Sequence, residues 1–168
     1  MFQINDVVVY GAHGVCRIVG TQMQKINGAN KMYFGLRPIG DGNATFYVPT
    51  WNEKALAKMR KVLDKQGVDA LIDSMPNMRT VWIENESARK ETYKQILSSG
   101  DQHEIISMIQ AIYLHKMERE AEGKHLHISD ECFMRDAEQL LYNEWQYVLN
   151  VDKAGLLTYI FERIESNK

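Results

Sequence analysis

Three histidines and a cysteine lie close together in the C-terminal half of the chain, and these are side chains that bind zinc. His125 and His127 form a His-x-His pair, with His115 before them and Cys132 after them. The pair falls in a stretch expected to be a loop, and no further ligand stands at a fixed spacing from it. We therefore expect no metal site in this segment.

Covalent or acid–base catalysis needs a nucleophile and a base at matched positions, and few side chains here offer that. His13 precedes Gly14, but no serine, cysteine or acid nearby has nucleophile–base spacing. A phosphate-binding glycine loop, a nucleophile elbow and paired carboxylates are absent from the sequence. We expect a protein that is not an enzyme and that uses no cofactor and no small-molecule substrate.

Composition is that of an ordinary soluble protein. The 168 residues are 45% hydrophobic and 25% charged, which suits one large or two small domains. No run of 18 apolar residues occurs, and the first residues lack the order of a signal peptide. We expect a cytoplasmic protein without a membrane contact, in which the widely spaced Cys16 and Cys132 are buried thiols.

The charge is divided unevenly along the chain. Residues 1–63 hold eight Lys or Arg and three Asp or Glu, a net charge of +5. Residues 64–168 hold twelve Lys or Arg and nineteen Asp or Glu, a net charge of −7. The charges of the two parts sum to the formal net charge of the chain, −2. A basic first part indicates an acidic partner, and an acidic second part argues against a broad phosphate-binding face there.

Short runs of β-branched and aromatic residues in the first part predict closely spaced antiparallel strands. They are expected at residues 7–10, 15–22, 31–38 and 44–49, with turns rich in Gly, Asn and Asp at 11–14, 27–30 and 40–43. Residues 52–63 have both helical and strand-like features, and a fifth strand around 58–62 would complete a small barrel.

From residue 64 onward, apolar residues recur at the spacing that is typical of helices. The expected N-caps are Asp64, Asn85 or Ser87, Asp101, Ser129 and Asp152. Pro76 follows the first helix, Gly100 closes the second near Ser98, and Asp101 with Glu104 predicts a capping box. The helix after Asp101 should be central, because its stripe is wide enough for two neighbours: Ile105, Ile106, Ile109, Ile112, Tyr113, Leu114 and Met117.

These patterns predict an α+β protein with two tightly joined domains. Residues 1–63 should form a small Tudor-like or SH3-like antiparallel β-barrel. Residues 64–168 should form an all-α domain of about five helices.

Three N-terminal motifs carry a resemblance to a known family. They are Asp6-Val7-Val8-Val9-Tyr10, His13-Gly14-Val15 and Phe46-Tyr47-Val48-Pro49. In order and spacing they resemble the RNA-polymerase-interacting domain that CarD-like regulators share with the bacterial transcription-repair coupling factor. In these motifs Tyr10 can cover the barrel, Gly14 can take positive φ, and the Val-Pro pair ends a strand.

The second part extends the likeness to the CarD-like proteins of low-GC Gram-positive bacteria. The segments that carry it are Trp82-Ile83-Glu84-Asn85-Glu86, Tyr93-Lys94, Ser99-Gly100-Asp101, Ile112-Tyr113-Leu114 and Ala121-Glu122-Gly123-Lys124. No helicase motor follows the barrel, so we expect a CarD-like regulator and not the coupling factor.

The resemblance implies two partners. The barrel would bind the β subunit of RNA polymerase by pairing an exposed strand with a strand of the subunit. The helical domain would meet promoter DNA at the upstream edge of the bubble, where a tryptophan enters the minor groove and basic residues hold phosphates. Such a protein stabilises the open promoter complex and is associated with the nucleoid through the polymerase.

The polymerase-facing residues implied by the resemblance are Gln24, Lys25, Tyr33, Thr45 and Tyr47. Arginines of actinobacterial relatives match Gln24 and Tyr47 in this chain, so the charge is absent at both positions. Lys25 adjoins the first, and Tyr47 can stack or donate a hydrogen bond. Tyr33 and Tyr47 also suit ordinary cross-strand pairing.

For DNA the resemblance implies Trp82 with the basic residues Arg89, Lys90 and Lys94. The family's wedge position falls on Glu86, an acid, and Trp82 lies one helical turn earlier. Trp82 equally suits a core position, and the basic residues equally suit a solvated helix face in which Glu86 pairs with Lys90. Where another phosphate-binding lysine is expected, the sequence reads Asp130-Glu131-Cys132.

Two hypotheses therefore remain for the second domain. In the first it contacts promoter DNA with an affinity that is weak in isolation and sensitive to salt. In the alternative, the protein is a protein–protein adaptor that docks on RNA polymerase while its helices never touch DNA, which the net charge of −7 and Glu86 favour.

Overall fold

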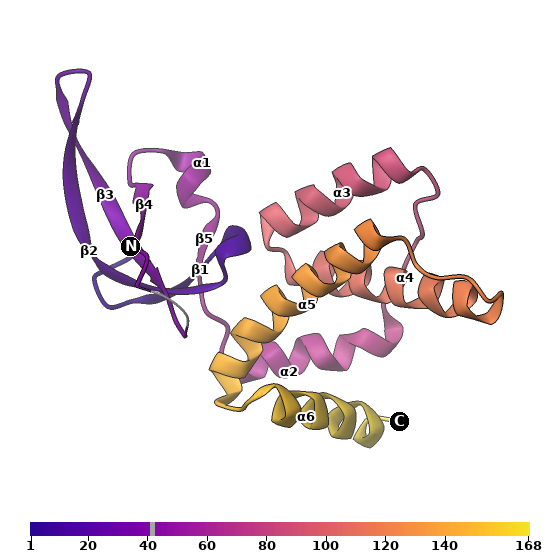
Figure 1. Ribbon diagram of the computed structural model, residues 1–168. Helices are drawn as coiled ribbons and strands as arrows, with labels where there is room; N and C mark the ends of the chain where they lie inside the picture. The colour runs from indigo at the N-terminus through magenta and orange to yellow at the C-terminus, as the bar shows by residue number, and fades with distance from the viewer. Residues whose placement is uncertain (41–42) are drawn as a thin grey trace. The chain divides into compact units, whose positions relative to one another are not determined.

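Alternating apolar residues near the N-terminus form five antiparallel strands in a single sheet (Figure 1). The computed structural model describes residues 1–40 and 43–168, and it divides the chain into two compact units, Met1–Val62 and Leu63–Lys168. The strands are β1 (Val7–Tyr10), β2 (Val15–Ile26), β3 (Ala29–Pro38), β4 (Phe46–Pro49) and β5 (Met59–Lys61), in the order β4-β3-β2-β1-β5.

The expected barrel is not closed. β4 and β5 lie at the two ends of the sheet order, and no pairing joins them within the described residues. Both strands are short, and the chain between them forms the helical turn α1 (Glu53–Leu56), which Asn52 caps by accepting a hydrogen bond from the Ala55 N–H. Residues 52–63, which have both helical and strand-like features in the sequence, thus contain a helix and a strand. The sheet keeps two edges, at β4 and at β5.

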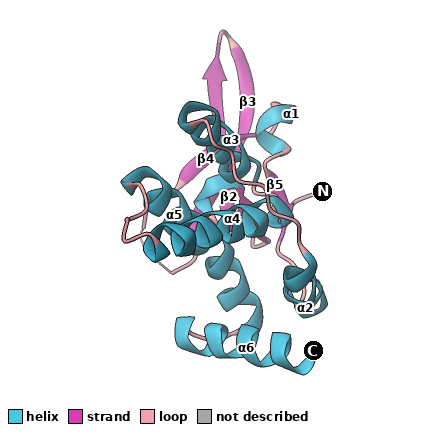
Figure 2. Cartoon of the chain, turned by 90° about the vertical axis from the view of Figure 1, so that its right-hand side faces the viewer, coloured by secondary structure: helices cyan, strands magenta, loops and turns pink. Residues whose placement is uncertain are grey.

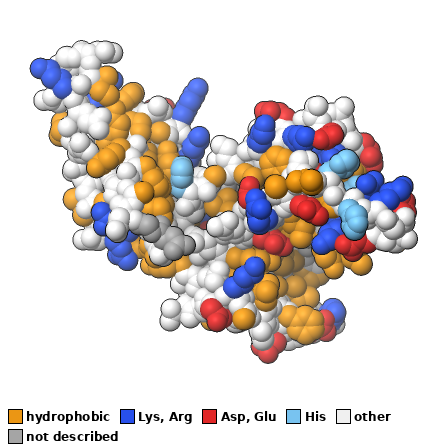
Figure 3. Space-filling model, in the orientation of Figure 1, with side chains coloured by type: hydrophobic (Ala, Val, Ile, Leu, Met, Phe, Trp, Pro, Cys, Tyr) orange, Lys and Arg blue, Asp and Glu red, His pale blue; other side chains and the backbone are white. Residues whose placement is uncertain are grey.

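The β2–β3 hairpin is longer than the sequence analysis predicted. Only Asn27 and Gly28 separate the two strands, and both have positive φ, 50° and 81°, as a two-residue type I′ turn requires. Hydrophobic side chains gather along this hairpin in Figure 3. The exposed Met23 of β2 and Met32 of β3 stand directly opposite each other in the pairing of the two strands. Gly14 has the expected positive φ, 73°, whereas the expected turn at 40–43 includes residues 41–42, which lie outside the described residues.

One face of the sheet carries the core of the first unit: Val8, Cys16, Ile18, Leu36, Val48 and Met59 are buried there. The sheet curls over this face, because Phe46 of β4 stacks against Tyr10 of β1 and tilts against His13. Tyr10 covers the core as expected. Burial raises the pKa of the Cys16 thiol to about 11, while Cys132, expected to be buried, is only half-buried.

The second unit consists of helices and loops, as Figure 2 shows by colour. Its helices are α2 (Lys65–Ser74), α3 (Glu86–Ser99), α4 (Gln102–Ala121), α5 (Ile128–Leu149) and α6 (Lys153–Ser166), with a 3-10 turn at Met75–Asn77. The chain thus holds six α-helices in its described residues, α1 lying in the first unit. No helix of the described chain has the length and apolarity to cross a membrane.

Side-chain caps set most helix starts where the sequence predicts them. Asp64, Asn85, Asp101 and Asp152 each accept a hydrogen bond from the backbone N–H three residues on. The prediction of Ser129 was wrong: α5 begins at Ile128 after His127, which makes no side-chain cap. Gly100 ends α3 in the left-handed conformation, with φ 70°.

A buried polar network joins three parts of the second unit. Glu144 of α5 accepts hydrogen bonds from the Leu63 N–H (3.0 Å) and from the side-chain amide of Gln102, the first residue of α4. The Gln102 carbonyl accepts from the Trp145 indole N–H at 3.2 Å. Glu144 and Trp145 are almost completely buried, so the network ties the half-buried first residue of the unit to its interior.

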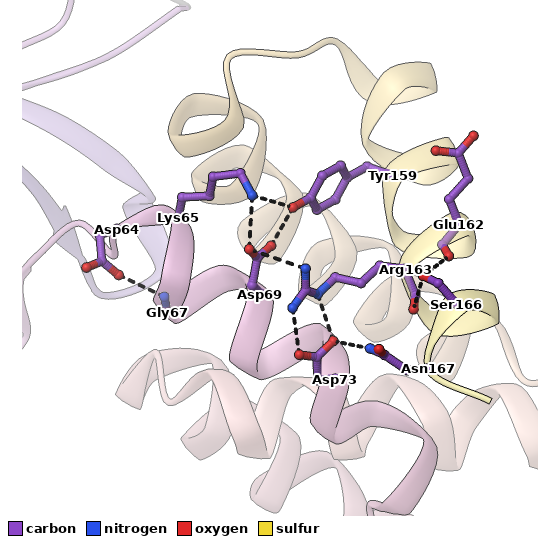
Figure 4. A network of polar contacts seen from close by, with 10 residues as sticks. All are labelled: Asp64, Lys65, Gly67, Asp69, Asp73, Tyr159, Glu162, Arg163, Ser166 and Asn167. Carbon is purple, nitrogen blue, oxygen red and sulfur yellow. Dashed lines mark hydrogen bonds and ion pairs between the residues drawn. The ribbon is translucent and has the colours of Figure 1, made fainter.

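A second network joins α2 to α6 (Figure 4). Asp73 accepts two hydrogen bonds from Arg163, both of 2.7 Å, and these bonds hold the pKa of Asp73 below its ordinary value. Burial raises the pKa of Asp69, but hydrogen bonds from Tyr159 (2.5 Å) and Lys65 (3.0 Å) more than offset it, so the net shift is downward. Helix α6 is thus held to α2 by charged groups as well as by apolar packing.

Candidate functional site

The outer face of the sheet, opposite the core, gathers four of the five residues predicted to contact a partner. Gln24 pairs with Lys31 and Gln22 with Tyr33, while Tyr47 pairs with Gly35. Directly opposed side chains share a face, and alternate residues of one strand share it too. Gln24, Tyr33, Tyr47 and the adjoining Thr45 therefore lie together, whereas Lys25 belongs to the core face of the hairpin, where its side chain is exposed.

The ring of Tyr47 lies over a glycine. A Cβ built on Gly35 would stand 3.4 Å from Cε1 of Tyr47 and 3.3 Å from Cγ2 of Thr45. Gly20, the β2 neighbour of Gly35, would meet nothing within 4 Å. The missing side chain at Gly35 therefore gives the Tyr47 ring its place on the sheet, with 47% of the residue exposed.

A basic and aromatic pair that the sequence analysis missed extends this face. The Lys31 ammonium lies 3.7 Å from the ring centroid of Trp51, which is half exposed. Lys31 stands two residues before Tyr33 on the same strand, and this spacing could have predicted that the two side chains share a face. We define the outer-face patch as Gln24, Lys31, Tyr33, Thr45, Tyr47 and Trp51.

The free edge of β4 borders this patch. The Thr50 N–H donates to the Met32 carbonyl at 3.1 Å, so Thr50 directs its backbone toward β3. Because bonded positions alternate in an antiparallel ladder, Val48 and Phe46 also face β3, and the backbone N–H and C=O of Tyr47 point away from the sheet. Pro49 has no N–H, as is usual at an edge. The edge thus offers one donor and one acceptor at Tyr47.

A match to a known family coincides with this unit. Residues 2–63 match the family model described as the CarD-like/TRCF RID domain. The first unit is a CarD-like/TRCF RID domain. This confirms the resemblance of the N-terminal motifs, and it makes the chain an RNA polymerase-interacting protein related to transcription. The match ends at residue 63, so the likeness of the helical unit stays a prediction.

In the helical unit outside the RID domain, Arg89 has an interior position. Its side chain donates to both carboxylate oxygens of Asp130, at 2.9 and 3.0 Å, and to the carbonyls of Ile83 and Glu84. Arg89 is 3% exposed and Asp130 is fully buried. The hydrogen bonds to Asp130 hold the pKa of Arg89 above its ordinary value. Arg89, predicted to hold phosphate, is therefore not accessible to DNA, because its side chain donates to groups inside the fold.

Trp82 is half-buried against the core of the helical unit. Its ring stacks on His115, with centroids 3.7 Å apart, and the Arg89 guanidinium carbon lies 4.4 Å from the same centroid. Two planar groups this close to one ring occupy its two faces. Only the edge of the indole remains for a partner, so an inserted wedge would require the stack to open.

The remaining basic candidates lie on the surface of α3. Lys90 pairs with Glu86 at 2.6 Å, the i,i+4 pair that the sequence predicts, and this contact holds the pKa of Glu86 below its ordinary value. Lys94 is exposed one turn further along. Among the described residues, no group of three or more His, Cys, Asp or Glu is placed to hold a metal ion, and His115 is stacked on Trp82.

Proposed function

We propose that the RID domain binds the β subunit of RNA polymerase by strand addition along the free edge of β4. The single observation that carries the proposal is the backbone of Tyr47, whose N–H and C=O point away from the sheet at an edge bordered by the outer-face patch. A strand of the partner would take up both groups, and main-chain pairing of this kind supplies affinity.

The side chains around the edge would select the partner strand. Lys31 and the net charge of +5 over residues 1–63 favour an acidic partner, and the rings of Tyr47 and Trp51 offer apolar contact area. The loss of arginines at Gln24 and Tyr47 is thus offset in part by Lys31, which stands directly opposite Gln24. The polymerase contact is retained with different side chains.

Replacing Tyr47 with proline should abolish binding to the polymerase β subunit, whereas Tyr47→Ala should weaken binding by about tenfold or less. Proline removes the outward N–H, which the β3–β4 ladder does not use, and alanine removes only the ring. Binding of the full chain to the isolated β-subunit lobe would be measured by calorimetry, with circular dichroism as a check on folding.

The matched control is Lys61→Pro at the opposite edge of the sheet. Gly11 N–H donates to the Lys58 carbonyl, so by the same alternation the Lys61 N–H faces away from β1. Lys61→Pro should therefore bind the lobe as the wild type does. Equal affinities for Tyr47→Pro and Tyr47→Ala would rule out strand addition at β4.

The second part of the proposal concerns promoter DNA. Lys94, Lys90 and the accessible edge of Trp82 would contact the minor groove and phosphates at the upstream edge of the bubble, stabilising the open complex without any covalent step. The unit carries a net charge of −7, so this contact would be weak alone and would depend on the tether that the polymerase provides.

A second candidate function is a protein–protein adaptor that docks on polymerase while the helical unit leaves DNA untouched. The burial of Arg89 and the pairing of the exposed Glu86 with Lys90 favour it, because they leave few free cations near the proposed wedge. Under this alternative the basic residues of α3 serve only the helix surface.

Charge reversal separates the two functions of the helical unit. If the unit contacts DNA, Lys94→Glu should shorten the lifetime of open promoter complexes several-fold, because it replaces a phosphate contact by repulsion. Lys168→Glu, two residues beyond the end of α6, serves as the matched control and should leave the lifetime unchanged. Lifetimes would be followed by competitor challenge at several salt concentrations. Equal lifetimes for both variants and the wild type would favour the adaptor.

A further inference from the structure

The apolar stripe of α4 is only partly covered by the helical unit. Ile105, Ile106 and Ile112 are buried, but Tyr113, Leu114 and Met117 are each 51% exposed. On α6, Leu157 and Phe161 are 44% and 66% exposed. The sequence analysis expected the whole stripe to pack on neighbouring helices. Hydrophobic side chains are visible over the lower part of this unit in Figure 3, where its surface is hollowed.

Three of these exposed side chains, Tyr113, Leu114 and Leu157, line a groove of about 480 Å³. Its wall is mainly apolar and includes Ile109, Met134, Leu157 and Ile160, from α4, α5 and α6. The apolar surface also continues past the groove by one helical turn, from Tyr113 to Met117 on α4 and from Leu157 to Phe161 on α6. A surface that extends beyond its cavity fits a macromolecular partner better than a small ligand.

The groove contains a single charged group among its described lining residues, Glu138 of α5. Burial raises the pKa of this carboxyl, although Lys153 and Lys116 act against the shift. No hydrogen bond to Glu138 occurs among the described residues. A cation brought into the groove by a partner would therefore meet a partly desolvated carboxylate that has no direct partner of its own.

We propose that this groove docks an amphipathic helix of another protein, with apolar residues at i, i+3, i+4 and i+7 and one Lys or Arg placed opposite Glu138. Two exposed helix faces flank the groove, which is the arrangement that receives a helix. The occupant carries positive charge because the unit around the groove has a net charge of −7. A second copy of the chain would bring the same negative charge and is disfavoured for that reason.

The test uses the full chain and a displayed library of helical peptides. Selection should enrich peptides with the stated apolar spacing and one basic residue. The best peptide should lose about tenfold or more in affinity against Leu114→Asp, whose side chain is exposed, so that the fold tolerates the change. Ile128→Asp is the matched control, because Ile128 is a more exposed apolar residue outside the groove, and it should bind normally.

A double-mutant cycle between Glu138→Gln and replacement of the peptide's basic residue by Gln tests the pairing itself. Each single change should weaken binding several-fold, and the two together should cost no more than one. The proposal is overturned if no peptide is enriched, if the enriched peptides bind Leu114→Asp equally well, or if the two changes are additive. It is also overturned if sedimentation shows a dimer of the chain that Leu114→Asp dissociates. These outcomes are independent of polymerase binding.

Discussion

Replacing Asp130 with alanine should lower the free energy of unfolding of the helical unit by about 3–5 kcal/mol, because it leaves the buried Arg89 guanidinium without its counter-ion. Both side chains are almost fully buried, and two hydrogen bonds of 2.9 and 3.0 Å join them. Urea unfolding followed by far-UV circular dichroism reports the helices directly and would give the change in the midpoint.

Two variants serve as controls for Asp130→Ala. Glu86→Ala breaks the exposed pair with Lys90 on the same helix as Arg89 and should change stability far less. The double variant Arg89→Met/Asp130→Leu replaces the pair by apolar side chains and should recover part of the lost stability, because the Ile83 and Glu84 carbonyls still lose their donor. An Asp130→Ala protein as stable as Glu86→Ala would show that Arg89 finds water or another partner.

The same pair has a consequence for the candidate DNA surface. Arg89 also donates to the Ile83 and Glu84 carbonyls and lies over the Trp82 ring, so it fixes the segment that carries the tryptophan. Loss of Asp130 should therefore loosen Trp82 as well as destabilise the unit. The residue that the sequence suggested as a phosphate contact thus acts by positioning Trp82.

Local patterns predicted the positions of the strands in the RID domain, but not how they assemble. Alternation and turn residues indicated four strands and left a fifth, around 58–62, as one of two possibilities, and the Val48-Pro49 pair marked the end of a strand. The prediction of a closed barrel was wrong, because closure requires β4 and β5 to pair, and they lie at the two ends of the sheet order. The chain between them forms the helical turn α1, which the Asn52 side chain caps. The Lys31–Trp51 contact is likewise a tertiary feature between residues on different segments.

In the helical unit the caps were predictable and the partners of the charges were not. Asp64, Asn85, Asp101 and Asp152 act over three residues, within the range of a local pattern. Arg89 meets Asp130 across 41 residues, and from the sequence its neighbours on α3 suggested a solvated face. The sequence reads Asp130-Glu131-Cys132 where the family likeness led us to expect a lysine. Of these three residues, Asp130 is fully buried and pairs with the interior Arg89.

Replacing Glu144 with alanine should cost about 1–4 kcal/mol, because the buried Gln102 amide loses its acceptor at about 1–3 kcal/mol and the half-buried Leu63 N–H loses its acceptor at a smaller cost. The effect should be local as well as global. The Leu63 N–H begins the helical unit, and its amide hydrogen exchange should be slow in the wild type and fast in Glu144→Ala. Urea unfolding gives the first quantity, and exchange followed by NMR gives the second.

Glu144→Gln is the informative comparison, because the amide keeps one acceptor oxygen but not two. It should satisfy either Leu63 or Gln102 and fall between the wild type and Glu144→Ala in stability. Glu131→Ala, an exposed acid on the same helix α5, should leave both stability and the Leu63 exchange rate near wild type. If Leu63 stays protected in Glu144→Ala, another acceptor holds its N–H, and the start of the helical unit is fixed by apolar packing of Leu63 against the core rather than by the carboxylate.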